Sequence, residues 1–187
     1  MGRAASAFIV FSLATVSCAR AQQDNTGGMI ASLNGGGIFG LGTHGSVGGS
    51  AAFLVSKYVV PFADFSYSPL TTYAFNYGTN NTGKALFTSG LLDANGGIRI
   101  RFPNSSYWAP YVGFGGGILH ITSTTNMSGF NSTETLHNSR NDPAGNVSAG
   151  ALYYVNQHVG LSIEIKGYLA QHEHFAQATA GLFFQIP

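Results

Sequence analysis

The stretch Pro110-Tyr-Val-Gly-Phe-Gly-Gly-Gly-Ile-Leu-His-Ile121 is apolar, aromatic and rich in glycine. Four glycines fall within five residues of it. They would destabilise a helix, whereas a strand accepts them where a curved sheet needs close backbone approach. The bulky residues Val112, Phe114 and Ile118 lie on one face, and almost nothing lies on the other. This pattern predicts a strand of a narrow β-barrel with an apolar outside and a cramped inside.

The composition favours a protein surrounded by lipid rather than by water. Of the 187 residues, 44% are hydrophobic and only 8% are charged, whereas a soluble domain carries about a quarter charged residues. The 26 glycines and the 13% aromatic residues are typical of barrels with tight turns and aromatic girdles. The net charge of +1 comes without a basic patch, so the sequence lacks the electrostatic footprint of nucleic-acid binding.

Residues 1–21 have the features of a secretory signal peptide. A positive charge precedes a short apolar segment, and Ala19-Arg20-Ala21 is a cleavage site of the A-x-A type. We therefore expect the mature barrel domain to cover residues 22–187. The single cysteine, Cys18, lies in the leader, so we expect no disulfide in the mature chain. The alternative is a lipoprotein anchored through Cys18, although Thr15 stands where that motif normally has leucine.

The rest of the chain alternates between apolar and polar residues, with no long helical periodicity. The leader is followed by no run of about 18 apolar residues. An exported chain of this kind enters a membrane only as a closed barrel, because lipid cannot satisfy an open sheet edge. We predict an all-β fold, an antiparallel up-and-down transmembrane β-barrel with eight strands at about 29–40, 46–55, 59–68, 85–102, 110–124, 146–154, 159–169 and 175–186. The alternative is a soluble β-sandwich, which the low charge and the absence of cysteine disfavour.

The predicted connections differ in length. Residues 69–84 and 125–145 are long, polar and rich in Asn, Ser and Thr, so we predict them as loops. Residues 40–45 and 170–174 form two shorter links. Bacterial outer-membrane barrels have short turns on one side and longer loops outside the cell. With both termini on the short-turn side, these four connections face outward.

Three strands resemble those of the small outer-membrane β-barrel family, which includes the OmpA-like and OmpW-like barrels. The glycine-rich stretch is similar to its P-Y-x-G-x-G-x-G strand, and residues 158–168 and 180–184 are similar to its last two strands. The resemblance implies a bacterial outer-membrane location, contact with outer-membrane lipid and insertion by the barrel-assembly machinery. Members usually end on Phe, whereas Gln185-Ile186-Pro187 follow Phe184 here. We expect no peptidoglycan-binding domain after the barrel.

Six charged residues lie on the polar faces of predicted strands. They are Asp64, Asp93, Arg99, Arg101, Glu164 and Lys166. A charge in a narrow lumen needs a partner or water, and three positive charges balance three negative ones. An ion-selective pore would carry a ring of one sign. We therefore predict a lumen charge network that fills the barrel, the alternative being a network that gates a channel.

His172-Glu-His174 is the one cluster with a catalytic character. The two histidines would share a strand face, as metal ligands or an acid–base pair could. Neither a third ligand nor a serine at a recognisable spacing accompanies them. We therefore predict no catalytic residue, no metal and no cofactor. Aromatic girdles at the two membrane interfaces explain the aromatic residues near strand ends. These are Tyr58, Tyr67, Tyr73, Phe102, Tyr107, Trp108, Tyr153 and Tyr168.

The sequence as a whole predicts a monomeric outer-membrane protein that is not an enzyme. Its role would be structural or would depend on surface interactions through its extracellular loops, with a lumen plugged by polar side chains. Two alternatives stay open. One is a narrow, porin-like channel or small-molecule carrier, and the other is a lipid A-modifying enzyme.

Overall fold

The computed structural model describes residues 27–77, 83–103, 106–128 and 133–187. The expected signal peptide, its cleavage site and Cys18 lie outside the described residues. The described chain forms eight strands: β1 (Met29–Phe39), β2 (His44–Phe53), β3 (Val59–Tyr77), β4 (Gly83–Arg101), β5 (Trp108–Ser128), β6 (Thr133–Tyr154), β7 (Val159–Ala170) and β8 (His174–Ile186). Among these residues there is no helix long and apolar enough to cross a membrane.

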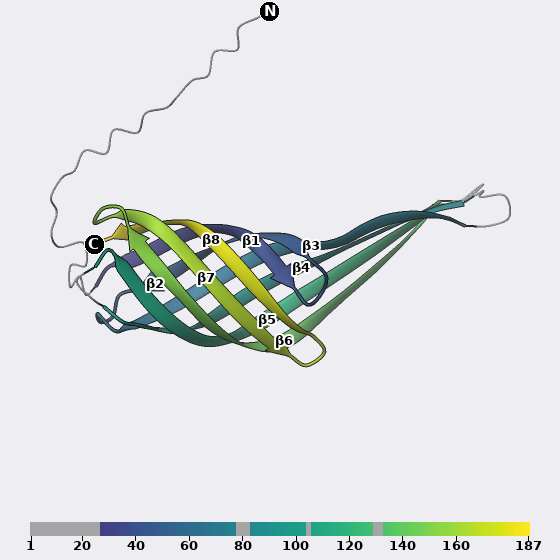
Figure 1. The fold of residues 1–187 in the computed structure, drawn as a ribbon. Helices are drawn as coiled ribbons and strands as arrows, with labels where there is room; N and C mark the ends of the chain where they lie inside the picture. The colour runs from purple at the N-terminus through teal and green to yellow at the C-terminus, as the bar shows by residue number, and fades with distance from the viewer. Residues whose placement is uncertain (1–26, 78–82, 104–105, 129–132) are drawn as a thin grey trace, which may run out of the picture.

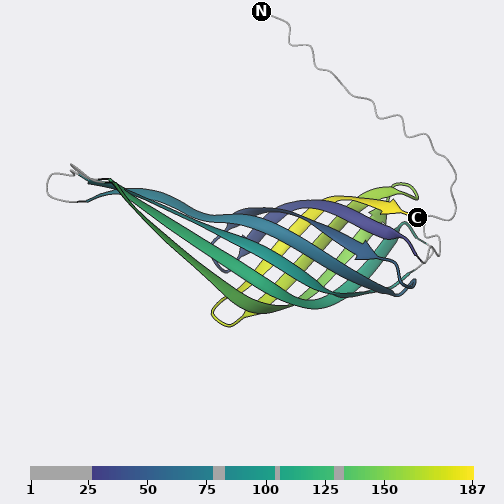
Figure 2. The ribbon, with the colours of Figure 1, turned by 180° about the vertical axis from the view of Figure 1, so that it is seen from behind.

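The eight strands form one closed barrel. Each strand pairs antiparallel with the next, and β8 pairs with β1 from Met29↔Ile186 to Phe39↔Ala176. Strands β3 to β6 project from one end of the barrel, and we call this end the mouth (Figures 1 and 2). The C-terminus lies at the opposite end. Because every barrel strand has two neighbours, no edge is left for lipid to satisfy. The predicted fold class is confirmed.

The glycine-rich stretch lies in β5, where Gly113, Gly115 and Gly117 face the lumen. A side chain at Gly117 would overlap the carbonyl oxygen of Ala94 in β4, and one at Gly115 would lie 2.6 Å from the carbonyl oxygen of Gly96. Backbone therefore occupies the space that a Cβ would need. The glycines let the sheet curve tightly enough to close with only eight strands.

Three layers of side chains fill the lumen. The layer nearest the C-terminus is apolar and consists of Ile30, Ala52, Leu54, Val60, Phe62, Ala109, Tyr111, Leu152, Tyr154 and Phe183. The layer at the mouth is also apolar and consists of Ile38, Leu91, Leu119, Ala144, Tyr168, Ala170 and Phe175. A polar layer lies between them. The sequence analysis predicted a polar interior and missed both apolar layers, because the large side chains that build them are scattered over seven strands.

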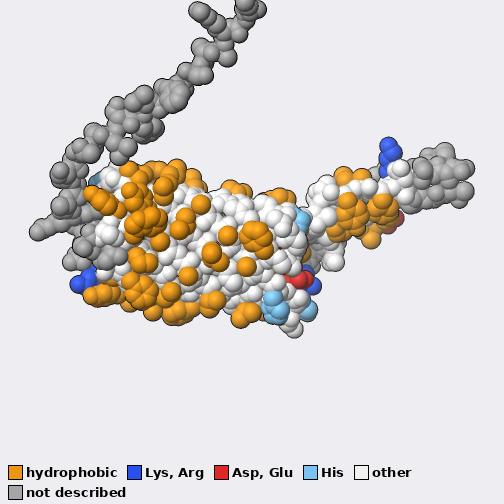
Figure 3. Space-filling view, viewed as in Figure 1, with side chains coloured by type: hydrophobic (Ala, Val, Ile, Leu, Met, Phe, Trp, Pro, Cys, Tyr) orange, Lys and Arg blue, Asp and Glu red, His pale blue; other side chains and the backbone are white. Residues whose placement is uncertain are grey.

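The outside of the barrel is apolar and exposed. Phe65, Val147 and Ile165 are each more than 60% exposed, and hydrophobic side chains are spread over the visible barrel surface, most densely toward the end away from the extension (Figure 3). An apolar surface of this extent is unfavourable in water and suits a hydrocarbon environment. Alternation thus directs large apolar residues outward on every strand.

One aromatic belt surrounds the C-terminal end of the barrel. Tyr58, Phe102, Tyr107 and Trp108 are exposed there, and the rings of Trp108 and Tyr153 lie 4.9 Å apart. Two of the residues predicted for the girdles lie elsewhere. Tyr168 is buried in the lumen, because its parity in β7 directs it inward. Tyr73 lies beyond the mouth, because β3 is longer than predicted.

Strands β3 to β6 continue past the mouth and form a four-stranded sheet that projects from the barrel (Figure 1). We call this part the extension, and it comprises residues 71–77, 83–90, 122–128 and 133–139. The prediction of long loops at 69–84 and 125–145 is therefore wrong, although residues 78–82 and 129–132 lie outside the described chain. The shorter links at 40–45 and 170–174 do connect strands at the mouth.

The extension reverses the polarity of the barrel. On the face that continues the outside of the barrel, one cross-strand row is Thr72–Thr88–Thr124–His137. On the face that continues the lumen, the corresponding row is Tyr73–Phe87–Thr125–Leu136. In the first row polar side chains face outward, and in the second row two aromatic rings and a leucine face inward, as expected where a strand leaves lipid for water. The last apolar outer row at the mouth is Phe65–Ala94–Ile118–Pro143.

Threonine and aromatic residues explain why these segments are strands. Both types favour extended backbone, and they pair across the sheet. The rings of Tyr73 and Phe87 lie 5.0 Å apart, and those of Tyr73 and Phe75 lie 6.0 Å apart. The abundant Asn and Ser suggested loops because these residues also favour turns.

Candidate functional site

Two ion pairs lie at the centre of the polar layer. Arg99 Nη2 is 3.1 Å from Glu164 Oε2, and Lys166 Nζ is 2.6 Å from Asp64 Oδ2. All four side chains are about nine-tenths buried. The pairs join β4 to β7 and β7 to β3, so they cross the lumen rather than link neighbouring strands. Charges buried to this degree stay ionised only with such partners.

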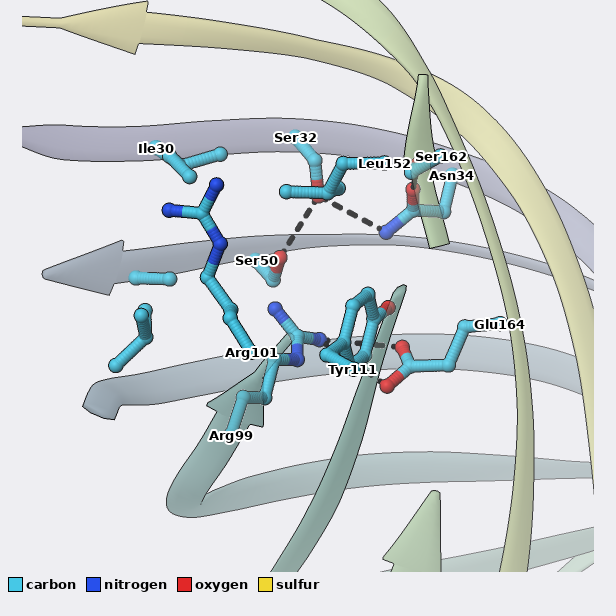
Figure 4. A pocket seen from close by; sticks show the side chains of 12 residues that line it. Ile30, Ser32, Asn34, Ser50, Arg99, Arg101, Tyr111, Leu152, Ser162 and Glu164 are labelled. Carbon is cyan, nitrogen blue, oxygen red and sulfur yellow. Dashed lines mark hydrogen bonds and ion pairs between the residues drawn. The ribbon is translucent and has the colours of Figure 1, made fainter. Parts of the chain in front are cut away.

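Aromatic rings support the two cations. The Arg99 guanidinium carbon lies 4.5 Å from the centre of the Phe62 ring and 5.0 Å from that of Tyr111. Lys166 Nζ lies 5.8 Å from the centre of the Tyr168 ring. Figure 4 shows Arg99 reaching toward Glu164 beside Tyr111. Cation–π contact with desolvated rings stabilises a positive charge that is buried away from bulk water.

Asp93 is held by neutral donors. The Tyr168 hydroxyl donates to Asp93 Oδ2 at 2.5 Å, and the Asn95 amide donates to Asp93 Oδ1. Asn95 in turn accepts a 3.0 Å bond from the Asn146 amide. The Gln177 amide nitrogen lies 3.2 Å from the hydroxyl oxygens of Ser46 and Ser66. The layer is therefore a hydrogen-bonded network as well as a set of ion pairs.

Arg101 lies apart from the other five charged residues, beside the apolar layer at the C-terminal end. Its Nη2 donates to the Tyr154 hydroxyl at 3.0 Å, and that hydroxyl donates to Gln185 Oε1 at 3.1 Å. The structure thus places all six predicted residues inside the barrel, four of them in two ion pairs. Asp93 and Arg101 share a strand face but do not meet.

The space left in this part of the lumen is small. One cavity of about 20 Å³ adjoins Arg99, Arg101 and Tyr111 (Figure 4), and a second of about 20 Å³ adjoins Asp64 and Lys166. A cavity of this size holds about one water molecule. Side chains therefore occupy nearly all of the polar layer.

A second charged cluster lies at the mouth. Asp142 is buried, with Arg140 Nη2 at 2.8 Å and His172 Nδ1 at 3.3 Å from its carboxylate oxygens. Arg140 also approaches Glu173 Oε1 at 3.3 Å. The described residues contain no group of three or more metal-ligating side chains. His172 thus pairs with a carboxylate, and the structure brings no further ligand to His174.

A pocket of about 220 Å³ opens beside this cluster, where the extension meets the two short links of the mouth. Its floor is apolar, formed by Leu41, Leu70 and Ile121, and its rim includes Arg140 and Glu173. The sequence analysis missed Arg140 and Asp142 because it assigned both to a loop. Side chains alternate in direction along a strand, so Asp142 lies on the same face of β6 as Asn146. Extending the predicted strand back from Asn146 would therefore have placed Asp142 in the lumen.

Comparison with known proteins rests on structure. No protein-family model matches the chain, and no curated protein matches it in sequence. Ail, the attachment invasion locus protein of Yersinia pestis, in complex with the heparin analogue sucrose octasulfate, is similar over 87% of this chain and 100% of its own, with a TM-score of 0.53 and 9% identity. Neisserial surface protein A is similar over 87% of this chain and 99% of its own, with a TM-score of 0.50 and 14% identity.

The fold is that of a small outer-membrane β-barrel. A de novo designed transmembrane β-barrel is also similar, over 88% of this chain and 100% of its own, with a TM-score of 0.50 and 15% identity. The resemblance to small outer-membrane barrels that the sequence suggested is thereby confirmed. A transmembrane β-barrel can also be designed de novo, so the fold alone does not decide the function, which has to be argued from the sites.

Proposed function

We propose that this chain is a bacterial outer-membrane protein whose barrel anchors the extension at the cell surface, where the extension contacts other molecules. The observation that carries the proposal is the reversal of polarity at the mouth. The outward side chains of the barrel are apolar and suit lipid, whereas those of the row Thr72–Thr88–Thr124–His137 in the extension are polar and suit water. The strands therefore continue beyond the bilayer as a folded element rather than as loops.

The orientation follows from the turns. The links β2–β3, β4–β5 and β6–β7 and the C-terminus lie at the end of the barrel away from the extension. In bacterial outer-membrane barrels the short turns face the periplasm. This orientation would expose the extension to the medium, and insertion would require the barrel-assembly machinery.

The contact surface is apolar and aromatic rather than charged. Tyr73, Phe75 and Leu136 are each about half exposed on the inner face of the extension. Lys84 is the only Lys or Arg in the described part of the extension, and Arg140 at its base pairs with two carboxylates. The Ail structure contains a sulfated heparin analogue. Since one lysine cannot attract a polyanion strongly, we propose contacts through aromatic rings and hydrogen bonds instead.

The proposed role requires neither transport nor chemistry. The two ion pairs between two apolar layers support a lumen plugged by side chains. The pairing of His172 with Asp142 supports a structural role for the mouth cluster, so we propose no enzymatic activity and no cofactor.

Surface labelling of single-cysteine variants tests the proposal. Asn76→Cys lies in the extension, and the matched variant Asn156→Cys lies in the exposed turn between β6 and β7 at the other end. On intact cells a membrane-impermeant maleimide should label Asn76→Cys and should label Asn156→Cys only after the outer membrane is opened. The unsubstituted protein is the blank. Equal labelling of both sites, or recovery of the protein in the soluble periplasmic fraction, would show that the proposed orientation is wrong.

A further inference from the structure

The extension has two sheet edges that the described chain leaves unpaired. In β3 the pairing with β2 ends at Tyr67, so residues 68–77 pair only with β4. In β6 the pairing with β7 begins at Ala144, so residues 133–143 pair only with β5. The two edges are therefore of nearly equal length. Each presents a row of backbone N–H and C=O groups that can pair with a further strand.

These edges lack most of the features by which proteins prevent edge-to-edge pairing. Natural edges are blunted by lysine, proline, bulges or a covering loop. The β3 edge has Pro69 and one bulge at its base, but no proline or charge follows in residues 71–77. In β6, Pro143 stands at the base, Arg140 near it pairs with Asp142 and Glu173, and Glu134 is the other charged residue among the exposed residues from Thr133 to Asn141. Both edges are therefore open to pairing beyond the proline.

The direction of the two edges indicates the partner. Since β3, β4, β5 and β6 pair antiparallel in sequence, β3 runs toward the tip and β6 runs back from it. Copies inserted in one membrane share one orientation. The β3 edge of one copy then lies antiparallel to the β6 edge of the next, so this contact continues the antiparallel pairing of the extension, which is slightly more stable per residue than parallel pairing. Two β3 edges, or two β6 edges, would be parallel in the same membrane.

We propose that copies of this chain associate at the cell surface by pairing the β3 edge of one extension with the β6 edge of its neighbour. The contact is head-to-tail and gives a ring or a chain of extensions. It goes beyond the proposed surface role but rests on the proposed membrane location, which aligns the copies. The aromatic inner faces of adjoining extensions would form one continuous surface. This proposal replaces the monomer that the sequence analysis predicted.

Cross-linking of co-expressed variants tests the contact. Ala74, Leu86, Asn126 and Thr135 form one cross-strand row on the outer face, with Ala74 and Thr135 at its two edges. Outer membranes from cells that co-express Ala74→Cys and Thr135→Cys chains are treated with a bis-maleimide that spans about two strand spacings of ~4.8 Å. Mixed dimers should form in this sample and should be absent when either variant is expressed alone.

The matched control uses the two central strands of the same row. Co-expressed Leu86→Cys and Asn126→Cys chains should give at least fivefold fewer dimers, because two further strands separate these sites in the proposed contact. Adding Ala74→Lys with Thr135→Lys to chains that carry cysteines at Thr72 and His137 should abolish the dimers. Leu86→Lys, in the same row but within the sheet, should leave them intact.

The outcomes separate the two proposals. A protein that reaches the outer membrane and gives no mixed dimers overturns the association and leaves the surface role standing. Dimers of Ala74→Cys alone would mean that like edges meet, and would equally overturn it. If the protein is missing from the outer-membrane fraction, the proposed location fails and the association fails with it.

Discussion

At the scale of single residues, the interior of this barrel depends on pairing between distant strands. Arg99 and Glu164 meet across the lumen, and so do Lys166 and Asp64. Their neighbours Tyr111, Phe62 and the apolar layers limit the access of water. In such surroundings a paired charge is tolerated, whereas a single remaining charge is costly.

We predict that Glu164→Ala lowers the free energy of unfolding by about 3 kcal/mol, because it leaves Arg99 buried without its carboxylate. Urea unfolding of the protein refolded into lipid vesicles measures the loss. Glu134→Ala is the control, since Glu134 is exposed in the extension and should change the stability by less than about 0.5 kcal/mol. A loss below about 1 kcal/mol at Glu164 would show that water solvates the pair.

Two adjacent glycines of β5 allow a sharper test of packing. Gly117→Ala should destabilise the barrel by roughly 1–3 kcal/mol, because the new methyl group overlaps the backbone of Ala94. Gly116→Ala faces outward, with its nearest neighbour, the Ala144 carbonyl oxygen, at 3.4 Å. It should change the stability by less than about 1 kcal/mol. The same unfolding measurement compares them, and equal effects would disprove the close approach of β4 and β5.

The sequence predicts which charged side chains enter the lumen better than it predicts which partner each one meets, because the partners lie on strands that are far apart in the sequence. Alternation in β7 places Glu164 and Lys166 in the lumen, since parity is a local property. Which charge each one meets depends on the register of strands that are not neighbours. The sequence analysis therefore identified the four paired residues, but it could not predict that Asp93 would pair with Tyr168 instead of an arginine.

At the scale of elements, strands β3 to β6 each pass through two environments without a break. Their lower parts place apolar residues outward, and their upper parts place aromatic residues inward. Neighbouring strands change together: the outer row Phe65–Ala94–Ile118–Pro143 is apolar on all four strands, and the outer row Thr72–Thr88–Thr124–His137 is polar on all four. The extension is thus held by its own cross-strand contacts in addition to its connection to the barrel.

We predict that Phe87→Ala loosens the extension and leaves the barrel unchanged. The ring contact between Phe87 and Tyr73 contributes roughly 1 kcal/mol, so amide exchange in the extension should accelerate about fivefold. Leu86→Ala is the control, because Leu86 is the next residue of β4 but faces outward. Hydrogen exchange resolved by segment measures both. Faster exchange throughout the barrel would contradict the independence of the two parts.

The extension also marks where prediction from sequence failed among the elements. Strand boundaries at the C-terminal end of the barrel agreed with the alternation, as for β7. Residues 71–77 instead combine strand-forming Thr, Tyr and Phe with neighbours that favour turns. Pairing with β4 over this whole segment decides the outcome, and a local pattern does not contain that information.

At the scale of the whole molecule, the barrel combines an apolar exterior with an interior of two apolar layers around a polar one. The cavities beside the polar layer hold about one water molecule each. An eight-stranded barrel leaves space that side chains alone can fill. The polar layer also contains balanced charges, unlike a selective pore.

We therefore predict that the refolded protein forms no steady ion channel in planar lipid bilayers. The expected record matches that of lipid without protein, apart from brief and irregular events. Circular dichroism of the same preparation shows that the barrel is folded. Large and stable single-channel steps would mean that the layers open, and the plugged lumen would have to be abandoned.

The bulge in β3 has an effect on the whole extension. Pro69 pairs with Gly90 and Thr71 with Ser89, so Leu70 is one residue more than β4 provides. Side-chain direction alternates along a strand, so an uncompensated extra residue exchanges its two faces. If Leu70 took a regular place in the ladder instead of bulging, Tyr73 and Phe75 would turn toward the medium and Thr72 toward the inside. The sidedness of the extension thus depends on the bulge at one position: deleting Leu70 would keep Thr71 paired with Ser89, whereas one further residue inserted there without a second bulge would invert the face that β3 displays.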